Sequence, residues 1–390
     1  MRFPEFSGEW KSKFINDLAS VVGGGTPDTS VKSFWDGNIQ WFTPSEIGKN
    51  KYVDSSLRTI TEEGLNNSSA KLLPPHTILL SSRATVGECS LSLKECATNQ
   101  GFQSLIAQSC DTNFLYYLIQ TKKKDLIRKA CGSTFLEISA SEVRKIQVKI
   151  PYDNEQKKIA DFLSLIDERI FTQNKIIEKY ESLIQAICDT LIEAEQHKVE
   201  LSFNDFGEPY SGLSGKSAED FGEGCLYITY VNVYQNQIID ITDVGLVKIN
   251  KIEQQSVVRY GDILFTLSSE TPNEVGMGAV YLGETYPLYL NSFCFGVHII
   301  DESKIFPPFL AYYISTKSFR KAVFPLAQGS TRFNLQKSDF MKKKFLFPTV
   351  EKQNKIYSVL KAYSDKLSIE KNIANLLCEQ KSYLLRQLFI

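Results

Sequence analysis

The sequence has few of the features that mark metalloproteins, secreted proteins and membrane proteins. Only three histidines occur in 390 residues, and the eight cysteines are scattered, with no pair in a C-x-x-C spacing. A structural zinc site is therefore disfavoured, and we expect the thiols to be reduced core residues. The first residues lack the apolar run of a signal peptide, and no segment approaches about 18 uninterrupted apolar residues. We therefore expect a cytoplasmic protein with no membrane partner.

Three short segments are similar to catalytic motifs, but each lacks a residue that the chemistry needs. Gly215-Lys216-Ser217 matches the end of a P-loop, yet Tyr210 stands where the leading glycine belongs. Phe306-Pro307-Pro308-Phe309 has no side-chain oxygen to hold a target amine, and Gly276-Met277-Gly278 has no properly placed third glycine. We therefore expect this chain neither to bind S-adenosylmethionine nor to hydrolyse ATP.

The net charge of -1 neither predicts nor excludes a nucleic-acid partner, so the distribution of charge matters more than its sum. Basic residues gather in one cluster at 122–129 and in another at 320–344. These clusters could supply phosphate contacts, which give affinity without sequence information. The alternative is a solvated helix face.

One long amphipathic segment dominates the pattern. From Asn154 to about Glu195, apolar residues recur every three or four positions, which is the spacing of a coiled-coil helix, and most of the pattern returns 197 residues later. Gln173 and Glu370 take the same position in the two segments, and polar seam residues commonly fix register, so we expect both near the middle of the helix pair. Any helix pair hides an apolar stripe, which is the simpler interpretation. The predicted seam comprises Ile159, Leu163, Ile166, Ile170, Gln173, Ile177, Ile356, Leu360, Tyr363, Leu367, Glu370 and Leu377.

The segments that precede these helices repeat as well. Gly329-Ser330-Thr331 follows Gly132-Ser133-Thr134 by 197 residues, and Pro348 follows Pro151 by the same number. We therefore predict an α/β (α+β) fold with two similar globular heads, at 1–151 and 200–348, and two long helices, at 152–199 and 349–390. The helices would pack as an antiparallel coiled coil with one head at each end, in a pseudo-twofold repeat. Within the first head we expect strands near 39–43, 77–81, 104–107 and 145–150 and one helix at 112–131.

Several motifs together carry a resemblance to one family. They are Gly24-Gly25-Thr26-Pro27, Trp35-Asp36-Gly37-Asn38-Ile39-Gln40-Trp41, Asn99-Gln100-Gly101, Gly132-Ser133-Thr134 and the segment 151–166, with their echoes in the second half. In this order, duplicated and alternating with two long helices, they resemble the specificity subunit of type I restriction-modification systems over essentially the full chain. The second head departs from the pattern, because Gly212-Leu213-Ser214-Gly215-Lys216-Ser217 replaces the G-G-T-P loop. This departure suggests two different half-sites.

The resemblance implies a non-catalytic subunit that binds double-stranded DNA. In that family each head is a target recognition domain that reads half of a bipartite site, and the helices set the gap and dock two methyltransferase subunits. Two restriction subunits join in systems that cut unmodified DNA. The resemblance also implies that S-adenosylmethionine, ATP and Mg²⁺ bind to partner subunits, with no cofactor or metal in this chain.

Candidate DNA contacts lie in loops of both heads. Arg83 could pair bidentately with guanine, whereas its predicted counterpart, Glu270, could accept from cytosine or simply be exposed. The two Gly-Ser-Thr loops could reach phosphates or base edges, or could be plain tight turns, and Asn99 and Asn291 could cap turns instead. The predicted set is Thr26, Lys32, Ser82, Arg83, Thr85, Asn99, Gln100, Ser133, Thr134, Lys216, Ser268, Ser269, Asn291, Ser330, Thr331, Arg332 and Asn334. The aromatic residues Trp35, Trp41, Phe42, Tyr116 and Tyr117 are predicted to be core residues.

Two other classes of function stay open from the residues alone. One is a dimerising coiled-coil adaptor whose two heads bind proteins, and the other is a free-standing enzyme, for which the sequence offers no cofactor site. Sequence-dependent binding to duplex DNA that weakens with salt would separate the first interpretation from the adaptor.

Overall fold

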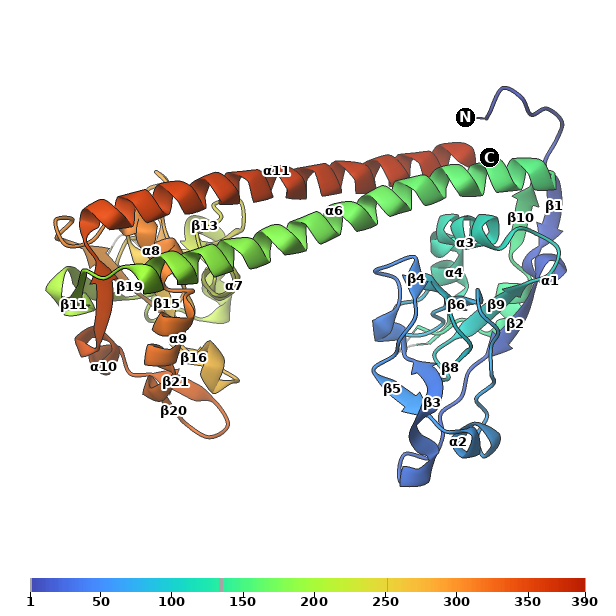
Figure 1. The fold of residues 1–390 in the computed structure, drawn as a ribbon, viewed down its shortest axis with the longest axis horizontal. Helices are drawn as coiled ribbons and strands as arrows, with labels where there is room; N and C mark the ends of the chain where they lie inside the picture. The colour runs from blue at the N-terminus through green and yellow to red at the C-terminus, as the bar shows by residue number, and fades with distance from the viewer. Residues whose placement is uncertain (1, 133–135, 251, 390) are drawn as a thin grey trace. The chain divides into compact units, whose positions relative to one another are not determined.

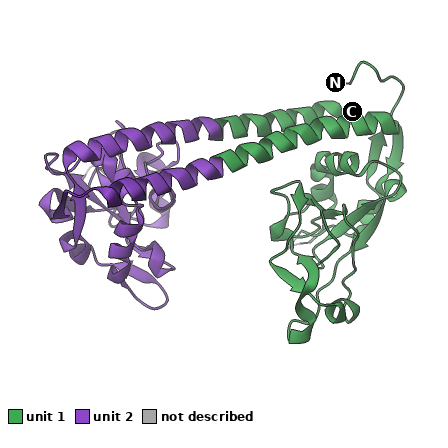
Figure 2. Ribbon diagram, viewed as in Figure 1, with its two compact units in different colours: residues 1–176, 371–390 green, residues 177–370 purple. Residues whose placement is uncertain are grey.

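The computed structural model describes residues 2–132, 136–250 and 252–389, and these divide into two compact units (Figure 2). Unit 1 comprises Met1–Ile176 and Lys371–Ile390, and unit 2 comprises Ile177–Glu370. Each unit therefore contains one head together with part of both long helices. Within the described residues, no helix combines the length and the apolar composition needed to cross a membrane.

The head of unit 1 is a set of three β-sheets with short helices packed on them (Figure 1). Its sheets have the strand orders β2-β9-β6-β7-β4, β5-β3-β8 and β1-β10. The elements are β1 (Lys11–Phe14), α1 (Ile15–Leu18), β2 (Ala19–Gly23), η1 (Lys32–Phe34), β3 (Trp35–Phe42), η2 (Pro44–Glu46), β4 (Tyr52–Val53), β5 (Arg58–Ile60), α2 (Glu62–Asn66), β6 (Ile78–Leu80), β7 (Cys89–Ser92), β8 (Cys96–Thr98), β9 (Gln103–Ala107), α3 (Thr112–Thr121), α4 (Lys123–Lys129), α5 (Ala140–Arg144) and β10 (Gln147–Ile150).

The core of unit 1 forms where the apolar face of α3 meets the five-stranded sheet and the long helices. Leu80 and Leu105 of the sheet, Tyr117 of α3 and Leu163 and Leu384 of the long helices belong to one buried cluster. The predicted core aromatic residues are all buried. The single helix predicted at 112–131 is wrong, because the chain breaks helical geometry at Lys122 and divides it into α3 and α4.

The head of unit 2 is built on a related plan with four sheets. Their strand orders are β12-β19-β15-β17, β14-β13-β18, β16-β21-β20 and β11-β22. The elements are β11 (Lys198–Ser202), η3 (Phe203–Asp205), β12 (Gly207–Ser211), η4 (Ala218–Asp220), β13 (Phe221–Ile228), α7 (Tyr230–Gln235), β14 (Val244–Val247), β15 (Ile263–Thr266), β16 (Ser268–Ser269), η5 (Pro272–Glu274), β17 (Gly278–Val280), β18 (Tyr289–Leu290), β19 (Cys294–Ile299), α8 (Pro307–Tyr313), α9 (Lys317–Val323), η6 (Phe324–Leu326), β20 (Ala327–Gln328), β21 (Phe333–Leu335), α10 (Lys337–Lys342) and β22 (Lys344–Pro348). Stacked and edge-on phenylalanine rings around Phe203 fill its core.

The two long helices are α6 (Asp153–Ala194) and α11 (Val350–Leu388). In unit 1, the first part of α6 lies antiparallel beside the last part of α11, and Lys381 pairs with Asp167 at 2.7 Å (Figure 2). In unit 2, the last part of α6 lies beside the first part of α11, and Lys352 pairs with Glu195 at 3.3 Å. Every predicted seam residue is buried or half-buried, including Gln173 and Glu370, which lie within a few residues of the unit boundaries.

A buried glutamine joins each head to the start of its long helix, in the same way in both units. In unit 1, the Gln156 amide donates to the carbonyl of Pro151 at 3.0 Å and accepts from the backbone N–H of Asp111 at 3.1 Å. In unit 2, Gln353 donates to Pro348 at 2.8 Å and accepts from the N–H of Phe306 at 2.8 Å. Asp111 and Phe306 are the N-caps of α3 and α8, so this glutamine positions the covering helix of the head against the long helix.

Candidate nucleic-acid interface

Segments that are distant in the sequence meet at one edge of the head of unit 1. Gly25 donates its N–H to Thr98 O at 2.8 Å, and the Thr26 hydroxyl donates to the side chain of Gln100. A Cβ placed on Gly24 would lie 2.0 Å from Asn99 O, so the loop reaches the turn at Asn99 only because position 24 lacks a side chain. The glycine-rich loop and the 99–101 turn therefore form one continuous surface.

The third and fourth segments of this edge are the turn after β6 and the loop that includes Glu137. Ser82 donates its N–H to Gly101 O at 2.8 Å and accepts from Ile138 N at 3.0 Å. The Arg83 guanidinium donates to Glu137 Oε2 from Nη2 at 2.7 Å and from Nε at 3.1 Å, and both side chains stay about 40% and 39% exposed. We call these four segments edge 1; they place an accessible arginine and an accessible carboxylate beside the half-exposed Thr26 and the exposed Gln100.

Unit 2 builds the equivalent surface, edge 2, with the same backbone contacts. A Cβ on Gly212 would lie 2.0 Å from Asn291 O, as Gly24 does against Asn99. Leu267 donates its N–H to Phe293 O at 2.9 Å and accepts from Leu335 N at 2.8 Å, which reproduces the two contacts of Ser82. The β20–β21 hairpin carries the Gly329-Ser330-Thr331 loop and lies on the side of its head away from the helices (Figure 1).

This register corrects the predicted match between the two heads. Arg83 forms a bridge with Glu137, and Ser268 forms the corresponding bridge with Asn334, so Ser268 is the counterpart of Arg83. The predicted match of Arg83 with Glu270 is wrong, because the strand in unit 2 is shifted by two residues relative to that alignment. Edge 1 therefore has a charged Arg83–Glu137 pair where edge 2 has the uncharged residues Ser268 and Asn334.

Several predicted DNA contacts are engaged in the fold instead. Ser82, Ser268 and Ser269 are buried, with Ser82 fully inaccessible; Ser268 and Ser269 pair with β21, and the backbone of Ser82 is hydrogen-bonded to Gly101 and Ile138. The Lys216 side chain is 4% exposed and pairs with Glu253 at 2.5 Å, which lowers the pKa of that carboxyl to about 2. We therefore no longer count these four residues among the DNA contacts.

The other predicted contacts fall into four groups. Thr26, Arg83, Thr85 and Gln100 lie on edge 1, and Ser330, Thr331, Arg332 and Asn334 lie on edge 2, where these last four are exposed. Asn99 and Asn291 accept the N–H two residues later, from Gly101 at 2.8 Å and Phe293 at 2.9 Å, so their side chains cap turns. Lys32 is exposed on η1, which packs against α2 and β3. Ser133 and Thr134 lie outside the described residues.

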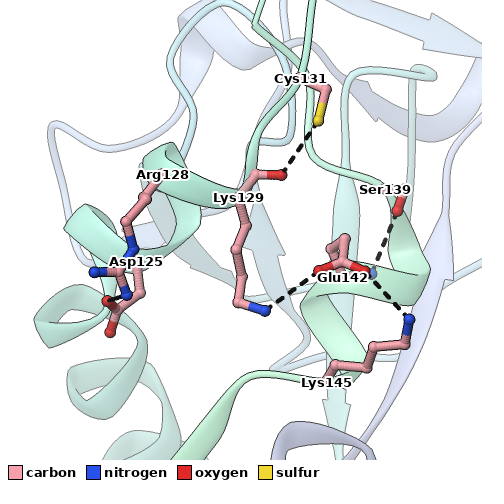
Figure 3. Close-up of polar contacts among 7 residues, drawn as sticks. All are labelled: Asp125, Arg128, Lys129, Cys131, Ser139, Glu142 and Lys145. Carbon is pink, nitrogen blue, oxygen red and sulfur yellow. Dashed lines mark hydrogen bonds and ion pairs between the residues drawn. The ribbon is translucent and has the colours of Figure 1, made fainter.

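The basic cluster of unit 1 is largely neutralised by its neighbours (Figure 3). Arg128 pairs with Asp125 at 2.8 Å, and Glu142 accepts from Lys129 at 3.3 Å and from Lys145 at 3.2 Å. The hydrogen bond from Lys129 is the largest of the contacts that lower the pKa of Glu142, so this carboxylate stays ionised at neutral pH. The cluster at 122–129 is therefore mainly a solvated helix surface with its own counter-charges, which was the alternative interpretation.

In the second basic cluster, Arg320 and Lys344 are engaged in the fold, whereas Arg332, like Lys321, Lys342 and Lys343, is exposed. Arg320 donates to the carbonyls of Asn273, Val275 and Gly276, so it holds the η5 loop. Lys344 pairs with Glu200 at 3.6 Å. Among the described residues, Arg332 makes no ion pair, and it projects from the exposed loop of edge 2.

Two residues of the edges were missed from the sequence. Glu137 follows the Gly-Ser-Thr loop by a few positions, and its role depends on a cross-strand neighbour that no local pattern reveals. Phe293 follows the Asn291 turn and is 58% exposed, unlike the five aromatic residues that were predicted to be in the core. The sequence does contain one indication of Phe293. When the two turns are aligned at their capping residues, Asn99 and Asn291, Phe293 takes the position of Gly101.

The eight cysteines are free, but not all of them lie in the core as expected. Cys131 and Cys378 are exposed, and Cys110 and Cys225 are half-buried. Burial raises the pKa of Cys89, Cys96 and Cys188 to about 12, so these thiols stay protonated.

The long helices carry a second candidate surface. On the part of α11 that belongs to unit 1, Ile373, Leu376 and Tyr383 are exposed at a spacing that repeats along one helix face. On α6, Leu165 and Phe171 are also exposed. Large apolar side chains in a row on a helix surface favour burial against a further helix.

Comparisons with known proteins agree on one family. The model of the type I restriction modification DNA specificity domain matches residues 7–182 and 220–379. The chain is 37% identical over 179 residues to the type I restriction enzyme MjaIX specificity subunit of Methanocaldococcus jannaschii, a match that covers 44% of this chain and 41% of that protein. It is 30% identical over 175 residues to the EcoR124I/EcoR124II specificity subunit of Escherichia coli, covering 43% of each. These matches thus span about two fifths of the relatives' length.

Longer matches are more distant. The MjaVIII specificity subunit of M. jannaschii is 22% identical over 393 residues, covering 95% of this chain and 89% of that protein. The crystal structure of a type I restriction-modification S subunit from M. genitalium has a TM-score of 0.54 at 18% identity, with 100% of this chain and 99% of that chain covered. These structural data support the fold of two similar heads with long helices.

Proposed function

Because the chain belongs to the type I restriction modification DNA specificity domain family, we propose that it is the DNA-reading specificity subunit of a type I restriction-modification complex. Each head would read one half of a bipartite, asymmetric site on duplex DNA. Edge 1 and edge 2 would be the reading surfaces.

One observation carries this proposal: the two edges have the same backbone contacts but carry different side chains. The glycine contact, the asparagine-capped turn and the bridged hairpin recur in both heads. On this common frame, Arg83 and Glu137 of edge 1 are replaced by Ser268 and Asn334 in edge 2. Arginine favours guanine, whereas the amide of the exposed Asn334 favours adenine and the buried Ser268 offers no side chain to DNA, so this replacement supports two different half-sites.

The helices would set the gap between the half-sites and hold the partners. The exposed apolar row on α11 supports docking of two methyltransferase subunits, and two restriction subunits would join where the system cuts unmodified DNA. This chain would be non-catalytic, with S-adenosylmethionine, ATP and Mg²⁺ bound by those partners. Replacing Leu376 by aspartate should prevent co-purification with the methyltransferase subunit, whereas Ser368→Asp, also exposed on α11, should not.

A methylome comparison tests the proposal. The cognate methyltransferase subunit is expressed in a methylation-free host with and without this chain, and modified adenines are mapped by long-read sequencing. The expected result is an asymmetric, gapped motif that requires this chain. If a stable complex forms and no motif appears, the heads do not read DNA, and the adaptor function becomes the better explanation.

Binding by the purified complex then tests edge 2 directly. Arg332→Ala should weaken binding to the mapped duplex, because an exposed guanidinium near DNA contributes either a base contact or a phosphate contact. If it is a phosphate contact, the slope of log K against log salt should fall by about 1. Lys321→Ala is the matched control, since Lys321 is an exposed cation on α9 of the same head.

A further inference from the structure

At the position that Gly101 takes in edge 1, edge 2 presents a large apolar side chain. Phe293 is 58% exposed, whereas its counterpart in edge 1 is Gly101. The equivalence rests on two contacts: each residue donates its N–H to a capping asparagine, and each carbonyl accepts from the next strand, from Ser82 N in one head and Leu267 N in the other. The two heads thus have the same backbone hydrogen bonds at this position, and only head 2 carries a phenylalanine there.

The backbone of Phe293 is held on both sides, so the exposed ring does not belong to a loose loop. Its N–H is bound to Asn291 Oδ1 at 2.9 Å and its carbonyl to Leu267 N at 2.9 Å. The next residue, Cys294, begins β19 and is fully buried. A fixed backbone reduces the entropy lost when the ring is buried in a complex.

Phe293 also lies close to the arginine of the same edge. Leu267 is hydrogen-bonded to Phe293 on one side and to Leu335 of β21 on the other, and β21 leads directly from the loop with Arg332. Two strand spacings, roughly 10 Å, separate Phe293 from Leu335, and Arg332 lies three residues before Leu335 in the chain, so the two backbones are roughly 14 Å apart. This is about four base-pair steps of roughly 3.4 Å, so both side chains can reach one half-site.

We propose that Phe293 recognises thymine by packing against its C5-methyl group in the half-site of head 2, an inference that rests on the proposed function. A phenyl ring cannot hydrogen-bond, and the thymine methyl is the apolar feature in the major-groove pattern of the four bases. Gly101 provides no such contact, so the half-site of head 1 lacks this particular source of thymine preference. Phe293 is therefore a specificity residue of one head only.

The test replaces thymine by uracil, which removes the methyl group and leaves the pairing edge unchanged. The complex of the full chain with its methyltransferase subunit is titrated with duplexes of the mapped motif, in which each thymine of both half-sites is replaced singly. In the wild type, one substitution should weaken binding about fourfold, the size expected for burial of one methyl group. Phe293→Ala should weaken binding to the thymine duplex by at least that factor and be insensitive to the same substitution.

Ile300→Ala is the matched control. Ile300 is 60% exposed and follows the opposite end of β19, so this variant should retain the wild-type sensitivity to uracil. Because both side chains are largely exposed, both variants should fold, which circular dichroism and a thermal melt establish.

Two results would overturn the inference. One is a wild-type complex that tolerates uracil at every thymine, and the other is a Phe293→Ala complex that keeps the full sensitivity. A loss of affinity in Phe293→Ala without any uracil effect would identify a wedge between base pairs instead of a methyl contact. Each result leaves the gapped methylation motif in place, whereas failure of the proposed function would remove the motif itself.

Discussion

Replacing Gln156 by leucine should destabilise unit 1 without adding bulk. Gln156 is 1% exposed, and its amide serves both the carbonyl of Pro151 and the N–H of Asp111. Leucine has a similar volume and cannot form either bond. The carbonyl of Pro151 and the N–H of Asp111 would then be buried without the hydrogen bonds that Gln156 provides.

The size of the effect follows from the cost of unsatisfied groups. Each buried donor or acceptor left without a partner costs about 1–3 kcal/mol, and the extra apolar burial of leucine returns about 1–2 kcal/mol. We expect the free energy of unfolding of unit 1 to fall by about 3 kcal/mol. With a urea m-value of about 3 kcal/mol/M, the midpoint should drop by about 1 M.

Tryptophan fluorescence provides an assay for unit 1 alone. All three tryptophans, Trp10, Trp35 and Trp41, lie in that unit, so a urea titration followed at their emission reports on its unfolding. Gln353→Leu makes the same change in unit 2 and should shift the circular-dichroism transition more than the fluorescence transition. Asn154→Leu is the surface control on α6, expected to change stability by less than about 0.5 kcal/mol.

A fluorescence midpoint for Gln156→Leu within about 0.2 M of the wild type would refute this reasoning, because the expected decrease in the urea midpoint is about 1 M. Equal fluorescence shifts in Gln156→Leu and Gln353→Leu would also refute it. The glutamines would then not be local connections between each head and its helix.

Three further predictions concern the edges, the thiols and one half-buried lysine. Gly24→Ala should lower the unfolding free energy of unit 1 by about 2 kcal/mol or more, because the new Cβ would lie 2.0 Å from Asn99 O. Gly23→Ala is the control: its Cβ would lie 3.7 Å from the nearest atom, Oε1 of Gln103, so the same fluorescence titration should show almost no change. An aromatic disulfide reagent at pH 8 should modify the exposed thiols of Cys131 and Cys378 first. Raising the pH from 7 to 9 should not increase the rate at which Cys89 reacts, because burial raises the pKa of its thiol to about 12 and keeps it protonated. Partial burial lowers the pKa of Lys51 to about 8, so the folded state loses this proton at a lower pH than the unfolded state does. Between about pH 8 and 10.4, the unfolding free energy of the wild type should therefore rise relative to that of Lys51→Met. A difference in unfolding free energy that falls over this pH range would contradict the assignment.

The repeat itself shows what residue order can and cannot establish. Pro151 and Gln156 recur as Pro348 and Gln353 at one constant shift, because the start of a long helix tolerates no insertion without rotating its seam. Inside the heads the shift varies: Gly24 matches Gly212, Ser82 matches Leu267 and Gly101 matches Phe293, at shifts of 188, 185 and 192 residues. Loops between these points differ in length, and matching the Ser-Ser pair before Arg83 with the Ser-Ser pair before Glu270 therefore aligned the wrong residues.

The candidate contacts divide in the same way. Exposed loop residues such as Arg332 could be proposed from their neighbours in the chain, since a Gly-Ser-Thr turn lies on the surface in either interpretation. Ser82 and Ser268 also follow strands and look equally polar, but both are buried and are paired with segments far along the chain, at Ile138 and β21. Burial of a short polar side chain depends on these distant segments, which the local pattern does not contain.

The sequence by itself determined the duplicated architecture, the two long helices and their seam, because helical periodicity and repetition are local properties carried by side-chain spacing. Only the tertiary structure decided which residues of the two heads are equivalent, that Arg83 faces Glu137, and that Phe293 stands exposed opposite Gly101. The physical reason is that strand register is set by hydrogen bonds between segments separated by many residues, and a shift of one residue exchanges the buried and exposed faces of a strand.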